Sequence, residues 1–280
     1  MVEVSWQAFN FHGNVRCVTH LYNTALSSFN SLLSRQALKL SWHLNLIPVA
    51  VLIPYHEDKI LQSNWWLRAS GCPDSHYSNN SNIMLVDHLL AVTENIDAFF
   101  NRPFFGFHAE MLTALNSMNV DRDIVQKELK LVSLLHDIGK VEDDKMLYTI
   151  HPLDHELVLK RHTVVSVRAA IEILGTDKAL SSDEKSRIYW AIEQHDISYG
   201  LYKQFLSTGY SPGFETWKTL NDKINTSDGA GLMYLLIFKL ADIHGHANIG
   251  DVIWFYKTVQ QNYFASLGLY LPIPVEDDMR

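Results

Sequence analysis

Apolar positions recur at helical spacing through most of the chain and predict a mainly α fold. In residues 83–100 apolar side chains return every three or four positions, and His88 lies on the same face. Such spacing is typical of an amphipathic helix. It also marks residues 18–41, 122–136, 162–174, 183–196 and 230–246. Strand patterns are scarce, so we expect a helical bundle held by helix-on-helix packing.

The first 80 residues differ from the rest, which predicts an N-terminal extension (1–80) followed by one helical domain (81–280). The longest apolar run, residues 44–54, is too short to span a bilayer and predicts a short buried strand or an irregular core segment. Residues 71–82 (GCPDSHYSNNSN) consist mostly of turn-forming residues and predict a loop at the boundary. Residues 207–231 predict a long loop with one short helix.

Composition limits the class of partner. The net charge is -8 with histidines neutral, which disfavours a surface that wraps nucleic acid. The two cysteines, Cys17 and Cys72, form no CxxC motif and favour a reducing compartment. The N-terminus does not have the pattern of a secretory signal. We therefore expect a soluble cytoplasmic protein without a membrane segment.

The chain has 14 histidines, and position decides which of them carry chemistry. The segment SLLHDIGK (133–140) places His136 beside Asp137 at the end of an apolar helix, where Gly139 is expected to form a left-handed cap. A charged Asp is costly to bury there unless it is paired or binds a metal. Imidazole and carboxylate ligands suit divalent Mn, Fe, Co, Ni, Zn or Mg.

This pattern resembles the HD superfamily of metal-dependent phosphohydrolases. The family signature is a His on an early helix, an HD doublet and a distant Asp, and the motif LLHDIGK is close to its usual form. The LADI context of Asp242 matches the final motif. The resemblance covers about residues 83–257 and implies a helical HD domain whose His136, Asp137 and Asp242 bind a divalent ion.

Two residues compete for the first His of the signature. His88 lies on an apolar helical face, and its VDHLLAV context resembles the HD domain of bifunctional uridylyl-transferring and uridylyl-removing enzymes. One residue between the Asp and the His of that family is missing here. His108 also has family-like spacing before the doublet, so both stay candidates.

His162 and His195 extend the ligand set. They begin and end predicted helices, in the order that the family places extra ligands between the doublet and the final Asp. The resemblance implies a second ion bridged by Asp137, or a single ion with both histidines at the substrate. Asp196 follows His195 as in a second doublet, but without the capped apolar context, so we expect a supporting or structural role for it.

Other polar residues near these motifs have weaker claims. Lys140 closes the HDxGK motif and either contacts a phosphate oxygen or points to solvent. Lys239 lies one helical turn before Asp242 and is the next candidate for phosphate. The remaining residues that could contact substrate or line the pocket are Lys160, Arg161, His151, His155, His244 and His246.

The expected function is hydrolysis of a phosphomonoester or phosphodiester, with nucleotides among the candidate substrates, by water that one or two divalent ions activate. Asp137, His162, His195 and Lys140 are the expected catalytic residues. The chain has no P-loop, GxGxxG or GxSxG motif. Three alternatives remain: a diiron oxygenase with the same ligands and fold, a metal-binding sensor domain without catalysis, and a structural protein whose histidines are incidental.

Overall fold

The computed structural model of the protein describes residues 55–75, 82–102, 108–118, 120–142, 145–224, 230–243 and 249–274. All of these belong to one compact unit that spans residues 53–280. The predicted helix over 18–41 and the predicted strand or irregular segment over 44–54 lie outside the described residues.

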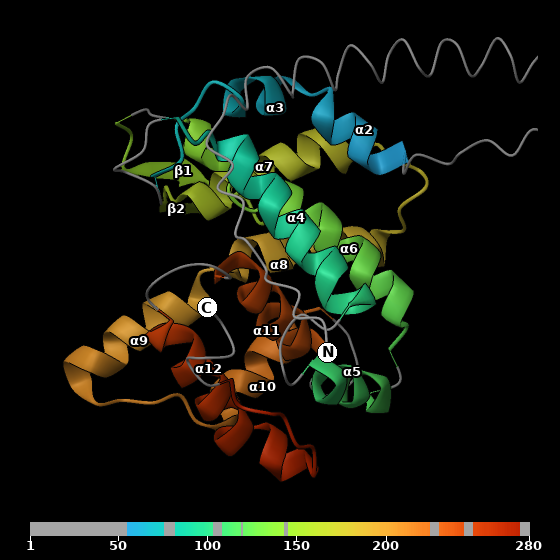
Figure 1. Cartoon of the computed structure of the whole chain (residues 1–280). Helices are drawn as coiled ribbons and strands as arrows, with labels where there is room; N and C mark the ends of the chain where they lie inside the picture. Colours follow the sequence, from blue (N-terminus) through green and yellow to red (C-terminus); the bar gives the residue numbers. More distant parts are fainter. Residues whose placement is uncertain are drawn as a thin grey trace, which may run out of the picture. The chain divides into compact units, whose positions relative to one another are not determined.

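The fold is mainly α, as the periodicity predicts, with one two-stranded sheet among the described residues (Figure 1). The helices are α2 (Tyr55–Leu61), α3 (Asn64–Ala69), α4 (Leu85–Asn101), α5 (His108–Ser117), α6 (Arg122–Leu135), α7 (His162–Leu174), α8 (Ser182–Gln194), α9 (Ile197–Thr208), α10 (Phe214–Asp222), α11 (Ala230–Ile243) and α12 (Gly250–Asn262), with 3-10 turns η2 (Ile138–Val141) and η3 (Phe264–Leu267).

Helix α11 is the centre of the bundle. Every residue from Ala230 to Ala241 is buried, and a helix that is apolar all round is stable only inside a protein. Helices α4, α6, α8, α10 and α12 all contact it (Figure 1). Helix α11 runs through the core. Asp242 is near its C-terminal end and therefore lies close to the ends of the surrounding helices.

Helices α4, α6 and α8 bury the stripes that the sequence predicts. On α4 the buried side chains include Leu85, His88, Leu89, Val92, Ile96 and Phe99. Helix α6 packs on α4 and α8, and α7 packs on α8 and η2. Side-chain caps fix two starts: Asp121 accepts hydrogen bonds from the first turn of α6, and Ser181 forms a capping box with Glu184 on α8.

Helices α2 and α3 precede the predicted boundary at residue 80, which stays a prediction, and they pack on α4, α6, α7 and η2. A buried carboxylate anchors α2: Asp177, between α7 and α8, accepts hydrogen bonds from His56 Nδ1 and Lys59 Nζ, both at 2.9 Å. These partners lower the pKa of Asp177 to about 2, although burial alone would raise it.

The short hairpin of β1 (Tyr148–Ile150) and β2 (Leu157–Leu159) was not predicted. Strands of three residues are too short to show a period of two. Tyr148 faces Leu159 and Ile150 faces Leu157 across the antiparallel pair, and all four side chains are exposed. The hairpin joins η2 to α7 beside the N-terminal end of α7 (Figure 1).

Gly139 does not form the left-handed cap that the sequence predicts. Gly139 lies in the 3-10 turn η2 instead. Among the described glycines, only Gly209 and Gly268 have positive φ. A Cβ on Gly139 would lie 2.4 Å from the carbonyl oxygen of His162 and 2.6 Å from the nitrogen of Ser166. The glycine is therefore needed because η2 and α7 approach each other this closely.

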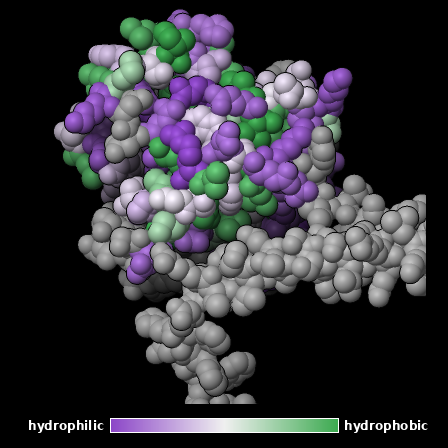
Figure 2. Space-filling model, turned by 90° about the horizontal axis from the view of Figure 1, so that it is seen from above, coloured by the Kyte–Doolittle hydropathy of each residue, from purple (hydrophilic) through white to green (hydrophobic). Residues whose placement is uncertain are grey.

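The surface seen from above mixes hydrophilic and hydrophobic residues (Figure 2). Exposed apolar side chains on α2 and α3 include Leu61 and Leu67. In the part of the chain that the structure describes, no helix has both the length and the apolar character needed to cross a bilayer.

Candidate metal centre

The doublet His136–Asp137 sits where α6 ends. The backbone nitrogen of His136 still donates to Val132, at 2.7 Å, so it closes the last turn. Asp137 then leaves the helix with φ -108° and ψ 0°, a sparsely populated region in which active-site residues are common. This turn lets two adjacent side chains, which would diverge on a continuing helix, reach the same cluster.

Four side chains form what we call the inner group: His88, His136, Asp242 and Oδ2 of Asp137. The Nε2 atoms of His88 and His136 lie 3.3 Å apart. Oδ1 of Asp242 is 3.4 Å from His88 Nε2 and 3.5 Å from His136 Nε2. Oδ2 of Asp137 is 3.4 Å from His136 Nε2 and 3.7 Å from His88 Nε2.

The outer group consists of His162, His195, Asp196 and Oδ1 of Asp137. The Nε2 atoms of His162 and His195 lie 3.4 Å apart. Oδ1 of Asp137 is 3.2 Å from His162 Nε2 and 3.5 Å from His195 Nε2. Asp196 places Oδ2 3.2 Å from His162 Nε2 and Oδ1 3.7 Å from His195 Nε2. Asp137 thus belongs to both groups through different oxygens.

The spacing of these atoms fits a divalent ion. Atoms that lie about 2.0–2.2 Å from one ion at coordination angles of about 90–110° are about 3–3.5 Å from each other. Most of the nitrogen and oxygen separations in both groups fall in or close to this range. Oδ1 of Asp137 is buried and accepts no well-aligned hydrogen bond from the described residues, which is unusual for a buried carboxylate oxygen.

Two of the histidines are held in the orientation that metal binding needs. His136 donates from Nδ1 to the carbonyl of Ser133 at 2.9 Å, and His195 donates from Nδ1 to the carbonyl of Ile192 at 2.7 Å. A proton fixed on Nδ1 leaves Nε2 of the neutral ring as the free lone pair. In both rings that atom points into the cluster.

The two groups differ in burial. The side chains of His88, His136 and Asp137 are at most 2% exposed, whereas those of His162 and Asp196 are 27% and 43% exposed. The cluster is therefore closed on its inner side and open to solvent at His162 and Asp196.

The charges of the cluster favour a cation. Burial alone would lower the pKa of His136, but Asp137 and Asp242 raise it to about 10. Asp137 and Asp196 likewise raise the pKa of His162 to about 9 against the effect of burial. The pKa values of Asp137 and Asp242 are well below the usual range although burial alone would raise them, because His136 acts most strongly on Asp137 and Lys239 most strongly on Asp242. Carboxylates in this cluster thus hold protons on imidazoles, and a divalent ion would displace those protons.

The structure brings together all six predicted ligands, including His88. His108, the alternative, is the first residue of α5, and its side chain lies outside the described part. His244 and His246 also lie outside it. His151 is buried 3.4 Å from Glu193 on α8, and His155 is exposed in the hairpin turn.

Two carboxylates have more prominent places than the sequence indicated. Asp196, expected to have a supporting role, presents its oxygens to both histidines of the outer group. Asp74, in the predicted loop, is buried with Oδ2 3.9 Å from Nδ1 of His88. Their contacts depend on tertiary packing, and the HD repeat in Gln194–Ile197 was the one available signal for Asp196.

The lysines and the arginine that could bind phosphate are placed differently from one another. Lys140 is part-buried, with Nζ 2.5 Å from Oδ2 of Asp137. Lys239 is buried and pairs with Asp242, which disfavours the predicted contact with phosphate. Lys160 pairs with Glu142 at 3.1 Å, and Arg161 is exposed before α7.

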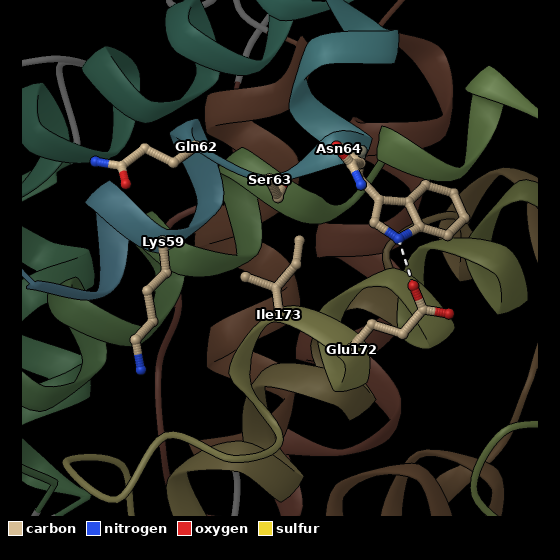
Figure 3. Close-up of a pocket in the computed structure, with 7 residues that line it drawn as sticks. Lys59, Gln62, Ser63, Asn64, Glu172 and Ile173 are labelled. Carbon is tan, nitrogen blue, oxygen red and sulfur yellow. Dashed lines mark hydrogen bonds between the residues drawn. The ribbon is translucent and has the colours of Figure 1, made fainter.

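A separate groove of about 430 Å³ lies between α2, α3 and α7 (Figure 3). Three of its polar side chains have partners: Trp65 Nε1 donates to Glu172 at 2.6 Å, and Lys59 donates to Asp177, which lies outside the groove. It contains no residue of the inner or outer group, so the metal centre remains the candidate functional site.

By its geometry the site belongs to the class of buried histidine–carboxylate clusters that can hold a metal ion. No family model, curated protein or solved structure matches the chain. The choice of a family and an activity therefore rests on the sequence motifs and on the site.

Proposed function

We propose that this chain is a divalent-metal-dependent phosphohydrolase of the HD type, acting on a phosphomonoester or phosphodiester. One observation carries the proposal: the two oxygens of Asp137 face two separate histidine pairs. A carboxylate shared in this way suits two ions about 3.5–4 Å apart, the arrangement of two-metal phosphoester hydrolysis.

The residues would divide the work by position. A bound divalent ion lowers the pKa of coordinated water from about 15.7 to about 7 in the strongest cases and offsets charge on phosphoryl oxygens. The side chains of His88 and His136 are at most 2% exposed and that of Asp242 is 11% exposed, so an ion held by them would be the less accessible of the two. The substrate would approach His162 and Asp196, the open side of the cluster.

Lys140 supplies the mobile positive charge in this proposal. Its ammonium group now pairs with Oδ2 of Asp137. An ion on that oxygen would compete with the ammonium group for Asp137, and the ammonium group could then hold a phosphate oxygen as a point charge. With an ion in the outer group, His162 would serve as a ligand through Nε2. With an ion in the inner group alone, His162, which is partly exposed and within reach of Asp196, would be the better placed of the two outer histidines to give a proton to the leaving oxygen.

The test combines metal analysis with a substrate screen. Purified protein is assayed for bound metal and then with nucleotides, cyclic nucleotides, phosphomonoesters and phosphodiesters in Mn²⁺, Co²⁺, Mg²⁺ or Ni²⁺. We expect one or two equivalents of metal and hydrolysis that Asp137→Ala abolishes. The control is His155→Asn, an exposed histidine at positive φ, where asparagine is tolerated.

Three results would contradict the proposal. Hydrolysis by Asp137→Ala at the wild-type rate would exclude the metal centre as its source. Metal binding without turnover of any phosphoester would favour the sensor domain. Oxygen consumption by the iron-loaded protein, without hydrolysis, would favour the oxygenase.

A further inference from the structure

A lysine is buried in α11, the most apolar of the described helices. Lys239 is 6% exposed and lies between Phe238 and Leu240, both fully buried, on α11. Burying an ammonium group is strongly unfavourable unless it is paired with opposite charge. Its partners therefore show what the charge does.

The partners of Lys239 are carboxylates around the metal centre. Its Nζ lies 3.4 Å from Oδ2 of Asp242, one turn later on α11, and 3.8 Å from Oδ2 of Asp251 on α12. Ser198 Oγ, on α9, is 3.4 Å from the same oxygen of Asp251. Burial alone would lower the pKa of Lys239, but Asp242, Asp251 and Asp196 raise it.

The two oxygens of Asp242 have separate partners. Oδ1 faces His88 and His136 of the inner group, whereas Oδ2 faces Lys239. An ammonium group on Oδ2 holds the carboxylate in one rotation, so that a single oxygen points at the ion position. Lys239 is too deeply buried to serve as a substrate-binding residue, in contrast to Lys140.

We infer that Lys239 is a positioning residue that acts as a permanent counter-cation of the metal centre, orienting Asp242 and holding the surrounding carboxylates together when no ion is bound. This inference rests on the proposed metal centre for its ion-bound half. What it says of the metal-free protein rests only on the contacts of Lys239.

Replacing a lysine with a purely structural role would lower stability equally with and without metal. For Lys239 the two losses should differ. Without Lys239, Asp242 loses its ammonium partner and keeps the imidazoles of His88 and His136. Asp251 keeps, among the described contacts, the hydroxyl of Ser198. A divalent ion restores a partner to Asp242. The loss of stability in a Lys239 variant should therefore be large without metal and much smaller with it.

The experiment measures melting temperatures of wild type and Lys239→Met, with chelator and with saturating Mn²⁺. Methionine keeps the length and removes the charge. We expect the chelated variant to melt on the order of 10 °C lower than wild type, and the Mn²⁺-loaded variant to lose less than half as much. Lys257→Met, an exposed lysine on α12, is the matched control and should change neither value.

A second variant keeps the inference testable if Lys239→Met folds poorly. Adding Asp251→Asn removes one of the carboxylates that lost its partner, so the double variant should melt above Lys239→Met in chelator. Equal losses with and without Mn²⁺, or no recovery in the double variant, would overturn the inference. If wild type binds no divalent ion, the proposed function fails, and recovery in chelator alone decides the role of Lys239.

Discussion

His136 and His195 meet edge to face at the centre of the cluster, with ring centroids 4.9 Å apart and an interplanar angle of 86°. Each directly follows a helix, donates from Nδ1 to the carbonyl three residues earlier and is followed by an aspartate. Asp137 and Asp196 also share a backbone conformation, with ψ of 0° and 3°. The same local arrangement thus occurs twice, once at the inner group and once at the outer group.

Asp137→Ala should remove the response of stability to chelator. Wild type should melt lower when chelated, because an ion that binds only the folded state stabilises it by mass action. Without Asp137 both groups lose an oxygen, so chelator should have almost no effect. Differential scanning fluorimetry with and without chelator measures this, and a wild-type response in the variant would exclude Asp137 as a shared ligand.

Asp196→Asn should affect the outer group alone. It weakens one ligand next to His162 and His195 but leaves His88, His136 and Asp242 unchanged. We expect about one equivalent of metal after dialysis where wild type retains two. Asp154→Asn, on an exposed carboxylate in the hairpin turn, is the control. Equal metal content in Asp196→Asn and wild type would show that Asp196 is not a ligand.

His88→Ala and His108→Ala distinguish the two candidates for the first ligand. His88 contributes Nε2 to the inner group, so its alanine variant should lose metal and activity. His108→Ala should retain both. Metal analysis of the two purified proteins is sufficient, and loss of metal in His108→Ala alone would reverse the assignment.

The stability of the metal-free protein should fall as pH rises above neutrality. His136 and His162 have folded-state pKa values of about 10 and about 9, above the unfolded value of about 6.5. Their contribution is complete below about pH 6.5 and is lost as pH rises through the folded values. Bound ions replace these protons. Melting temperature should therefore decline between about pH 7 and about pH 9.5 in chelator and less with Zn²⁺; equal slopes would contradict this.

Another prediction concerns the buried Glu128, which belongs to neither the inner nor the outer group. It is fully buried, accepts hydrogen bonds from Nε and Nη2 of Arg187 and accepts one from the hydroxyl of Tyr234 at 2.6 Å. Arg187→Met leaves a buried unpaired carboxylate and should cost about 3–5 kcal/mol, whereas Tyr234→Phe should cost about 1–2 kcal/mol. Urea unfolding measures both, and recovery in Glu128→Gln/Arg187→Met is the control.

The helices that carry ligands could be predicted because they are amphipathic and have clear ends. The predicted range 162–174 coincides with α7, and 122–136 differs from α6 by one residue. Helix α9 was not predicted, although Ile197, Leu201 and Phe205 recur every four residues along it and the first two pack on the core. This stripe is short and only half-buried, and Ser198 is the one fully buried residue of the helix. Likewise, spacing along the chain could not separate His88 from His108, because only the packing of α4 on α6 decides which imidazole reaches the doublet.

Gly139 gives the histidine–carboxylate cluster a constraint on sequence change that involves none of its donor atoms. The distance between the doublet and the outer group depends on how closely η2 approaches the first turn of α7, and the missing methyl group at 139 sets that distance. A related chain could keep all its histidines and aspartates and still move the doublet away from the outer group, if a residue with a Cβ replaced this glycine. In evolution, then, Gly139 should vary as little as Asp137 itself.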